Sequence, residues 1–273
     1  MNKTKVAAIQ MASSPNVSAN LIEAGRLVEK AATQGAALVV LPENFAMMGL
    51  DESDKLEVAE GDGGGPIQDF LARTAEKYKV WLVGGTIPIR AREGKVWAGC
   101  LVFDAGGKRV GRYDKIHLFD VNVPGTEEKY FESNTIDPGD NSLVLDTPFG
   151  RMGVAICYDL RFPELFRQMA DSGMDLLAVP SAFTARTGAD HWDVLVRARS
   201  VENLCYTVAS NQGGFHVNGR ETYGHSMIVD PWGKVLGSLA TGAGVVVSEI
   251  DPERLRKVRT SFPVLTHRRL RCR

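Results

Sequence analysis

The chain has 273 residues, enough for one large α/β domain or two smaller ones, and a domain of this size buries about three quarters of its unfolded surface. Apolar residues make up 44% and charged residues 24%, which excludes a disordered or fibrous protein. A net charge of −1 argues against nucleic acid and anionic membranes as partners. No apolar run reaches the roughly 18 residues of a membrane span and no segment resembles a signal peptide, so we expect a cytoplasmic location.

The first half of the chain alternates between strand and helix patterns. Strands are predicted at 5–11, 37–41, 80–84, 96–103 and 109–113. Apolar residues recur at helical spacing from Leu21 to Ala31, after a candidate N-cap at Asn16 or Ser18. Pro66 is expected to open a second helix.

The second half continues the alternation and predicts an α/β fold. Strands are expected at 152–157, 175–179, 205–210, 226–229 and 245–250, and helices at 163–172 and 190–203. The number of strands favours two sheets in one domain, residues 4–252. Residues 254–273 hold eight Lys or Arg and no acid, so 253–273 is interpreted as a basic arm that packs on the domain or on a partner subunit.

The four cysteines are widely separated, at positions 100, 157, 205 and 272. Their spacing fits no zinc site, they are too few for a disulfide scaffold, and the histidines form no ligand pair, so no metal is expected. Cys157 stands apart because the apolar segment 152–157 leads into it and a helix follows near Pro163. Such a thiol would emerge at the carboxyl end of a strand, where ligands of α/β sheets bind. A buried, unreactive cysteine remains the alternative for this position considered alone.

Two further segments supply a carboxylate and an ammonium. Glu43 follows the apolar run 37–41 and Pro42, so its carboxylate is expected at the rim of a sheet. Lys115 lies between aromatic and apolar residues in Tyr113–Asp120. Taken singly, each could be an ordinary surface residue. Together with Cys157 they supply what thiol-based amide hydrolysis needs: a thiolate favoured by a nearby ammonium, a carboxylate that moves protons, and a cation for the oxyanion.

These three motifs, LPENF around Glu43, YDKIHLFD around Lys115 and GVAICYDLRFPELF around Cys157, resemble the Glu–Lys–Cys triad of the nitrilase superfamily of carbon–nitrogen hydrolases. The resemblance extends over nearly the whole chain, and the segment YGHSMIVDPWG is similar to the Nit subgroup. It implies a four-layer αββα sandwich, a homodimer or higher homo-oligomer, and no cofactor. It also implies a second glutamate that supports Lys115; Glu132 fits this place, with Glu127 and Glu128 as neighbouring candidates.

The resemblance further implies a cysteine-dependent amidase that converts a small carboxamide to a carboxylate and ammonia through a thioester on Cys157. Deaminated glutathione is the expected substrate, and 2-oxoglutaramate-type ω-amides or N-carbamoyl amines are the alternatives. Glu43 is expected to accept the proton, and Lys115 to donate protons and to stabilise the oxyanion. A non-catalytic scaffold would be expected to have lost part of the triad, which is complete here.

Several other residues are candidates for substrate binding. The Tyr158 backbone N–H could stabilise the oxyanion, and Phe183, Thr184 and Thr187 could form a pocket wall. Arg161 could bind a substrate carboxylate, but a structural ion pair with Glu164 or Asp159 is the favoured role. His117 is expected to make a structural hydrogen bond. A Cys–His pairing of Cys157 with His191 or His225 is the competing catalytic arrangement, but it leaves the other two motifs unexplained.

Overall fold

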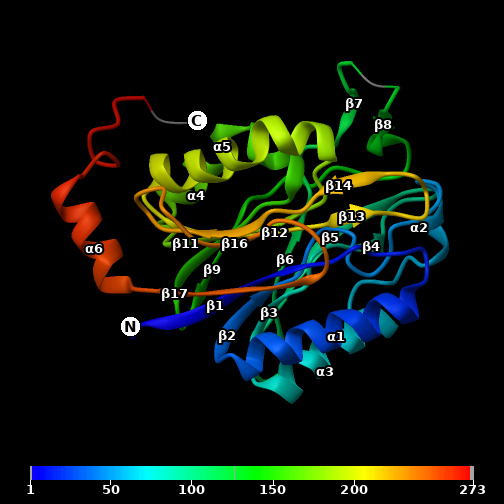
Figure 1. Ribbon diagram of the computed structural model, residues 1–273, viewed down its shortest axis with the longest axis horizontal. Coiled ribbons are helices and arrows are strands. Elements are labelled where there is room, and N and C mark those ends of the chain that lie inside the picture. Colours follow the sequence, from blue (N-terminus) through cyan, green and yellow to red (C-terminus); the bar gives the residue numbers. More distant parts are fainter. Residues whose placement is uncertain (1, 126, 271–273) are drawn as a thin grey trace.

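Two central β-sheets lie face to face, with a pair of helices covering each outer face (Figure 1). This computed structural model describes residues 2–125 and 127–270. The arrangement is the four-layer αββα sandwich that the resemblance implies. The helices lie on the outer faces because parallel strands in one sheet need crossover connections, and these helices supply them.

The first sheet has seven strands. In spatial order they are β17 (Gly244–Ile250), β1 (Thr4–Gln10), β2 (Ala36–Val40), β3 (Trp81–Val83), β5 (Val96–Phe103) and β4 (Ile87–Arg90), with β6 (Arg109–Asp114) paired to β5. Strands β1, β2 and β3 are parallel, and α1 (Val17–Thr33) and α3 (Pro66–Tyr78) connect them. The expected N-cap Asn16 accepts a hydrogen bond from the Ala19 N–H, and Pro66 opens α3 as predicted.

The second sheet has six strands. Their order is β16 (Val235–Leu239), β15 (Ser226–Val229), β12 (Tyr206–Asn211), β11 (Leu176–Ser181), β10 (Gly150–Val154) and β9 (Leu143–Thr147). Strands β10, β11 and β12 are parallel, and α4 (Pro163–Asp171) and α5 (Ala185–Asn203) connect them. Carboxyl ends of parallel strands meet at one edge of each sheet, so the loops after these strands are brought together.

Strand β1 shows how the residues fill two cores. Val6 and Ala8 belong to the core between the sheets, whereas Ala7 and Ile9 pack toward α1 and α3. The alternation follows the period of two in a strand, and both faces are apolar because both are covered. Ser210 of β12 joins the sheets, because its hydroxyl donates to the Val40 carbonyl at 2.6 Å and accepts from the Ile9 N–H at 3.1 Å.

Shorter elements extend beyond the sheets. They are α2 (Asp54–Glu57), the pair β7 (Asp120–Asn122) and β8 (Lys129–Phe131), the pair β13 (Gly213–Phe215) and β14 (Glu221–Tyr223), the 3₁₀ turns η1 (Glu132–Asn134) and η2 (Cys157–Arg161), and α6 (Pro252–Ser261). In Figure 1, α6 lies at the left end of the sandwich, and both short strand pairs lie toward the right.

Two predicted boundaries were wrong. The strand predicted at 152–157 ends at Val154, and Cys157 begins the turn η2 instead. The helix predicted at 190–203 begins earlier, at Ala185, because the Thr184 side chain caps it by accepting from the Thr187 N–H. The short elements α2, β4, β7, β8, β9, β13, β14 and β16 were not predicted either, since too few residues carry a periodic pattern.

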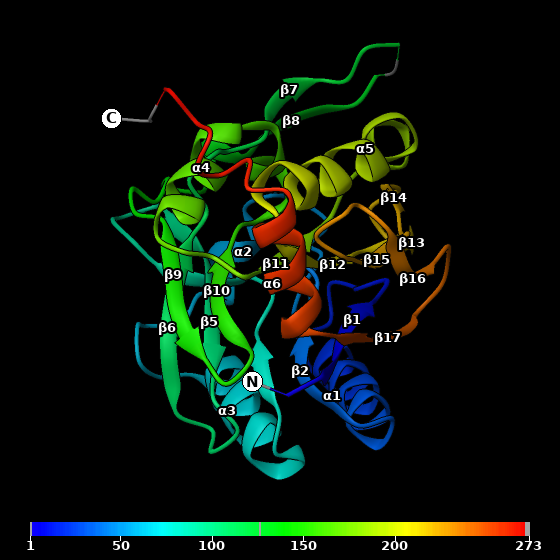
Figure 2. The ribbon, with the colours of Figure 1, turned by 90° about the vertical axis from the view of Figure 1, so that its left-hand side faces the viewer.

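Helix α6 opens the basic C-terminal segment and packs on the sandwich. Leu255 and Val258 are buried, and the Arg259 guanidinium pairs with Asp175 and donates to the Leu204 carbonyl. Figure 2 shows α6 crossing the end of the molecule that faces the viewer. The last three residues of the predicted arm, Cys272 included, lie outside the described residues. Within residues 2–125 and 127–270, no helix has the length and hydropathy to span a membrane.

Candidate active site

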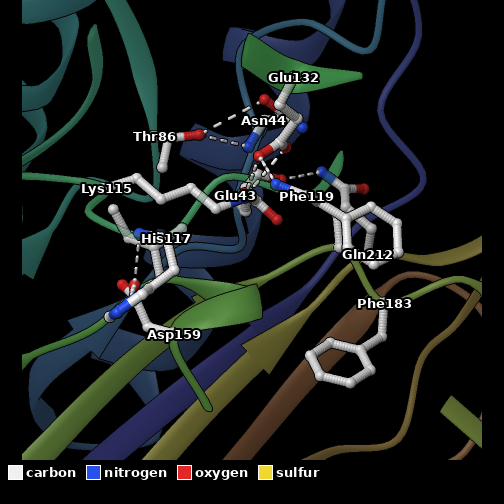
Figure 3. Close-up of polar contacts among 12 residues, drawn as sticks. Glu43, Asn44, Thr86, Lys115, His117, Phe119, Glu132, Asp159, Phe183 and Gln212 are labelled. Atoms are coloured by element: carbon white, nitrogen blue, oxygen red, sulfur yellow. Dashed lines mark hydrogen bonds and ion pairs between the residues drawn. The ribbon is translucent and has the colours of Figure 1, made fainter. Parts of the chain in front are cut away.

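The backbone around Glu43 is fixed by hydrogen bonds from two directions. Glu43 follows β2 after Leu41 and Pro42, and only 3% of its surface is exposed. The Gln212 side chain donates to the Glu43 carbonyl at 3.0 Å, and the next residue, Asn44, adopts a left-handed φ of 56° while its N–H donates to the Thr86 hydroxyl at 2.8 Å. These contacts hold the Glu43 carboxylate at the rim of the first sheet, as the sequence predicted (Figure 3).

The Lys115 ammonium lies between two carboxylates (Figure 3). Its Nζ donates to Glu43 Oε1 at 2.8 Å and to both oxygens of Glu132, at 2.9 and 2.8 Å. Glu132 belongs to η1, and its Oε2 also accepts from the Phe119 N–H at 2.8 Å. Lys115 is 1% exposed. Glu132 is therefore the second acid that contacts Lys115, beside Glu43, and it is the residue that the sequence favoured over Glu127 and Glu128.

This ion-pair cluster keeps Lys115 charged. Burial by itself lowers the pKa of Lys115, but the carboxylates of Glu132 and Glu43 outweigh burial and raise the pKa well above its usual value. Burial raises the pKa of Glu132, whereas Lys115 and Lys55 bring it below its usual value. At neutral pH the site therefore holds an ammonium beside at least one carboxylate, and the ammonium can stabilise negative charge that develops nearby.

Cys157 lies in a turn with an uncommon backbone conformation. Its φ is +48°, a region that L-residues rarely adopt, and the turn η2 begins at this residue. Asp159 fixes the turn, because its Oδ2 accepts from the Ile156 N–H at 2.8 Å. The turn takes the thiol out of the line of β10 and into the pocket beside Lys115 and Glu43. Strained residues of this kind cluster at functional sites.

The environment of Cys157 favours the thiol over the thiolate. Burial raises its pKa, the Glu43 carboxylate raises it further, and the Lys115 ammonium lowers it only in part, so the pKa lies well above the usual value. The Lys115 ammonium favours the thiolate, as expected, but burial and Glu43 outweigh its effect on the pKa of Cys157. The sulfur needs a base at the moment of attack, and the Glu43 carboxylate is beside it.

Asp159 connects both halves of the site and was not predicted in this role. Its Oδ2 also accepts from the Tyr113 hydroxyl at 2.7 Å, and its Oδ1 accepts from the His117 N–H at 3.1 Å. His117 Nδ1 lies 2.7 Å from the same oxygen, so the structural hydrogen bond expected for His117 is present (Figure 3). The strand before Lys115 is thereby tied to the turn that carries Cys157.

One pocket brings the predicted residues together. It encloses about 330 Å³ of empty space, including space open to solvent. Its lining includes Glu43, Lys115, Glu132, Cys157, Tyr158, Arg161, Phe183, Thr184 and Thr187, all of them predicted. It also includes Asn44, Phe119, Ala182 and Arg220, which were not predicted. Asn44 adjoins the predicted Glu43, whereas Arg220 lies in a hairpin loop that carries no recognisable motif.

Arg161 makes neither of the ion pairs considered for it. Its guanidinium nitrogens lie 3.3 Å from His191 Nδ1, and its Cζ lies 5.7 and 5.6 Å from the ring centres of Tyr158 and Phe183. No carboxylate pairs with it among residues 2–125 and 127–270. The preference for a structural pair with Glu164 or Asp159 was wrong, because Asp159 is fully buried and already accepts several hydrogen bonds.

The competing Cys–His arrangement has no support in the geometry. His191 contacts Arg161, and His225 Nδ1 lies 2.9 Å from the Tyr223 carbonyl oxygen, while neither histidine lines the pocket that contains Cys157. Among the described residues, no group of three or more His, Cys, Asp or Glu could hold a metal ion.

A buried thiol beside a carboxylate and an ammonium is equipped to attack the carbonyl carbon of an amide. Fold and site together define a hydrolase of non-peptide carbon–nitrogen bonds. The comparisons agree with this class: the model of the family described as carbon–nitrogen hydrolase matches residues 5–260. The chain belongs to the carbon–nitrogen hydrolase family.

Within this family, the chain is similar to several named relatives and solved structures. The chain is 44% identical to a deaminated glutathione amidase of Synechocystis over 266 residues, covering 96% of this chain and 97% of the relative. It is 38% identical to the omega-amidase NIT3 of Saccharomyces cerevisiae, covering 98% and 94%. The crystal structure of Saccharomyces cerevisiae Nit3, described as a member of branch 10 of the nitrilase superfamily, superposes with a TM-score of 0.88 at 35% identity and covers 98% of this chain and 97% of that one.

Proposed function

We propose that this protein is a cysteine-dependent amidase that hydrolyses deaminated glutathione through a thioester on Cys157. The observation that carries the proposal is the shared pocket of Glu43, Lys115 and Cys157, with Lys115 Nζ 2.8 Å from Glu43 Oε1. The similarity to a deaminated glutathione amidase supports the choice of substrate. Arg161, unpaired with any carboxylate among the described residues, is proposed to bind a carboxylate on the acyl side of the amide.

Acylation begins when Cys157 Sγ attacks the amide carbon and Glu43 accepts the thiol proton. The Lys115 ammonium and the Tyr158 backbone N–H stabilise the oxyanion of the tetrahedral intermediate, and a well-placed donor contributes about 3–4 kcal/mol to such stabilisation. The carbon–nitrogen bond then breaks, and the proton held by Glu43 passes to the leaving nitrogen. A primary amide releases ammonia, whereas a secondary amide such as deaminated glutathione releases an amine. The ammonia expected from the sequence therefore applies to the primary amides among the alternative substrates and not to deaminated glutathione.

Deacylation uses the same groups in reverse order. Glu43 accepts a proton from water as the water oxygen attacks the thioester carbon. The second tetrahedral intermediate expels the Cys157 sulfur, which takes the proton back, and the carboxylic acid leaves. The raised pKa of Cys157 suits this cycle, because the sulfur is a thiol at rest and gives up its proton only with Glu43 beside it.

The main alternative is an omega-amidase acting on 2-oxoglutaramate-type amides, which the similarity to omega-amidase NIT3 favours. The same three residues would serve that reaction, and they would also serve an N-carbamoyl-amine hydrolase. A non-catalytic scaffold, the alternative from another class, needs no such arrangement of buried charges in one pocket, and burying them is costly.

Turnover of deaminated glutathione, 2-oxoglutaramate and an N-carbamoyl amino acid by the purified protein tests the proposal. We expect the highest kcat/KM for deaminated glutathione and an acyl adduct on Cys157 in the intact-mass spectrum of a rapidly quenched reaction. Cys157→Ala should lose both, while Cys205→Ala, which removes a buried thiol that does not line the pocket, should retain both. Full turnover by Cys157→Ala would exclude the thioester mechanism.

We also propose a cytoplasmic homodimer. Val194 and Val201 of α5 are 64% and 46% exposed, and Phe262, directly after α6, is 48% exposed. Large apolar side chains gathered at the surface are typical of a subunit contact. Sedimentation equilibrium should give twice the chain mass, and Val194→Asp together with Val201→Asp should shift it to the single-chain mass.

A further inference from the structure

Arg220 is a half-buried guanidinium without a carboxylate partner in the catalytic pocket. It lies in the loop between β13 and β14, and its Nη2 donates to the Ala182 carbonyl at 2.6 Å. Its Nε is buried and has no hydrogen-bond partner, and its Cζ lies 4.9 Å from the ring centre of Tyr130. Among residues 2–125 and 127–270, no ion pair to Arg220 occurs. The guanidinium has five N–H donors, and the bond to Ala182 uses one of them, so N–H groups at its end are left to bind an anion in the pocket.

Arg220 stands where the catalytic pocket meets a second, larger pocket. The second pocket encloses about 930 Å³ of empty space, including space open to solvent, and shares Asn44 and Arg220 with the catalytic pocket. Met47 and Tyr130 are among its walls. Cys157 does not line it, so a ligand there extends away from the reacting carbon while remaining continuous with the catalytic pocket.

The two unpaired arginines of the catalytic pocket lie on different elements. Arg161 belongs to η2, four residues after Cys157, whereas Arg220 belongs to the distant hairpin loop that borders the second pocket. An amide has an acyl side and a leaving-amine side. One cation for each side fits a substrate with an anionic group on both sides of the bond that breaks.

We infer that Arg220 determines specificity by binding a carboxylate on the leaving-amine side of the substrate, which extends into the second pocket. The inference rests on the proposed function and deepens it. Deaminated glutathione has a carboxylate on each side of its scissile amide, the second one at its glycine end. A 2-oxoglutaramate-type amide releases ammonia and offers Arg220 nothing to bind. Arg220 therefore favours an extended, dianionic amide over a short one. The second pocket supplies room for its length, because the acids Asp51, Glu52 and Glu128 in the lining offset Lys55 and Lys129.

A pair of substrates isolates this contact: deaminated glutathione and its analogue with a C-terminal glycinamide in place of glycine. The wild-type kcat/KM for the acid should exceed that for the amide roughly tenfold to hundredfold, as expected for a hydrogen bond between charged groups. In Arg220→Gln this ratio should fall close to one, mainly because KM for the acid rises. Arg220→Lys should retain part of the preference, because it keeps the charge and loses the planar fork.

Arg186→Gln is the matched control. It removes the same charge from an exposed position that lines neither pocket. The inference is overturned if wild type does not distinguish the two substrates, if folded Arg220→Gln keeps the ratio, or if Arg186→Gln lowers it equally. If Arg220→Gln fails to fold, Arg220→Lys takes its place. The ratio of kcat/KM for the acid to kcat/KM for the amide should then be lower in Arg220→Lys than in wild type, and an unchanged ratio overturns the inference. Hydrolysis of neither substrate by wild type would instead overturn the proposed function, and the inference with it.

Discussion

The Tyr113 hydroxyl donates a 2.7 Å hydrogen bond to Asp159 Oδ2 and so joins the two sheets of the sandwich at the active site. Tyr113 lies in β6 of the first sheet, two residues before Lys115, and Asp159 lies in η2 after the second sheet's β10, two residues after Cys157. The contact therefore sets the nucleophile and the ammonium relative to each other, although neither of its two residues lines the pocket.

Tyr113→Phe tests this link. Removing the hydroxyl leaves a buried carboxyl of Asp159 with one donor fewer, so the free energy of unfolding should fall by about 1–3 kcal/mol. The kcat should fall more than KM rises, because the groups that react are misplaced. Urea unfolding and steady-state kinetics measure both effects. Tyr78→Phe removes a hydroxyl from a half-buried tyrosine outside the site and should change neither; an equal effect of the two substitutions would contradict the link.

Glu132→Gln should lower kcat/KM by roughly 100-fold, because Lys115 then loses one of its two carboxylates and its fixed position. The fold should persist, since the Phe119 N–H keeps an oxygen acceptor. Steady-state kinetics on the preferred amide measure the loss. Glu127→Gln neutralises an exposed acid in the same segment and should leave activity at the wild-type level. If Glu127→Gln were the damaging substitution, the assignment of Glu132 would be wrong.

Glu43→Gln should make Cys157 more acidic while it abolishes amide turnover. After burial, the Glu43 carboxylate is the main cause of the raised pKa of Cys157, and Lys115, which remains, lowers that pKa. The pH at which iodoacetamide alkylation reaches half its maximal rate should therefore shift downward relative to wild type, with peptide mass spectrometry to confirm the modified residue. Glu127→Gln serves again as the control. An upward shift would mean that the carboxylate does not act on the sulfur as a negative charge.

Cys205 should make stability depend on pH above about 8.5, the usual pKa of an unfolded thiol. Burial raises the pKa of Cys205 to about 12 in the folded protein. Because the folded state binds this proton more tightly, its contribution is complete below pH 8.5 and is lost as the pH rises toward 12. Between pH 9 and 11, the free energy of unfolding should therefore fall less steeply in Cys205→Ala than in wild type. The two slopes should differ by about 1.4 kcal/mol per pH unit.

Urea unfolding at several pH values measures this slope. Val208→Ala, which truncates a buried residue of β12 without a titrating group, should lower stability by an amount that does not vary with pH. A slope in Cys205→Ala equal to that of wild type would show that the thiol ionises equally well in both states.

Long elements and the three reactive positions were predictable from local pattern. The segments 37–41 and 96–103 are continuously apolar, and such runs predict strands covered on both faces, which β2 and β5 are. Cys157, by contrast, was expected in a strand. The apolar run 152–157 does not predict the positive φ of Cys157 at its end. That conformation is held by Asp159, which accepts a hydrogen bond from the Ile156 N–H, and not by an intrinsic preference of cysteine.

The sequence by itself determined the alternation of strands and helices, the class of chemistry, and the positions of Glu43, Lys115 and Cys157, because periodicity and short motifs are local properties of the chain. Only the tertiary structure decided that Glu132 contacts Lys115, that Asp159 ties the two sheets together, that the Cys157 thiol keeps its proton, and that Arg220 enters the pocket. Each of these depends on burial and on distances between segments far apart in the chain, which residue order does not specify.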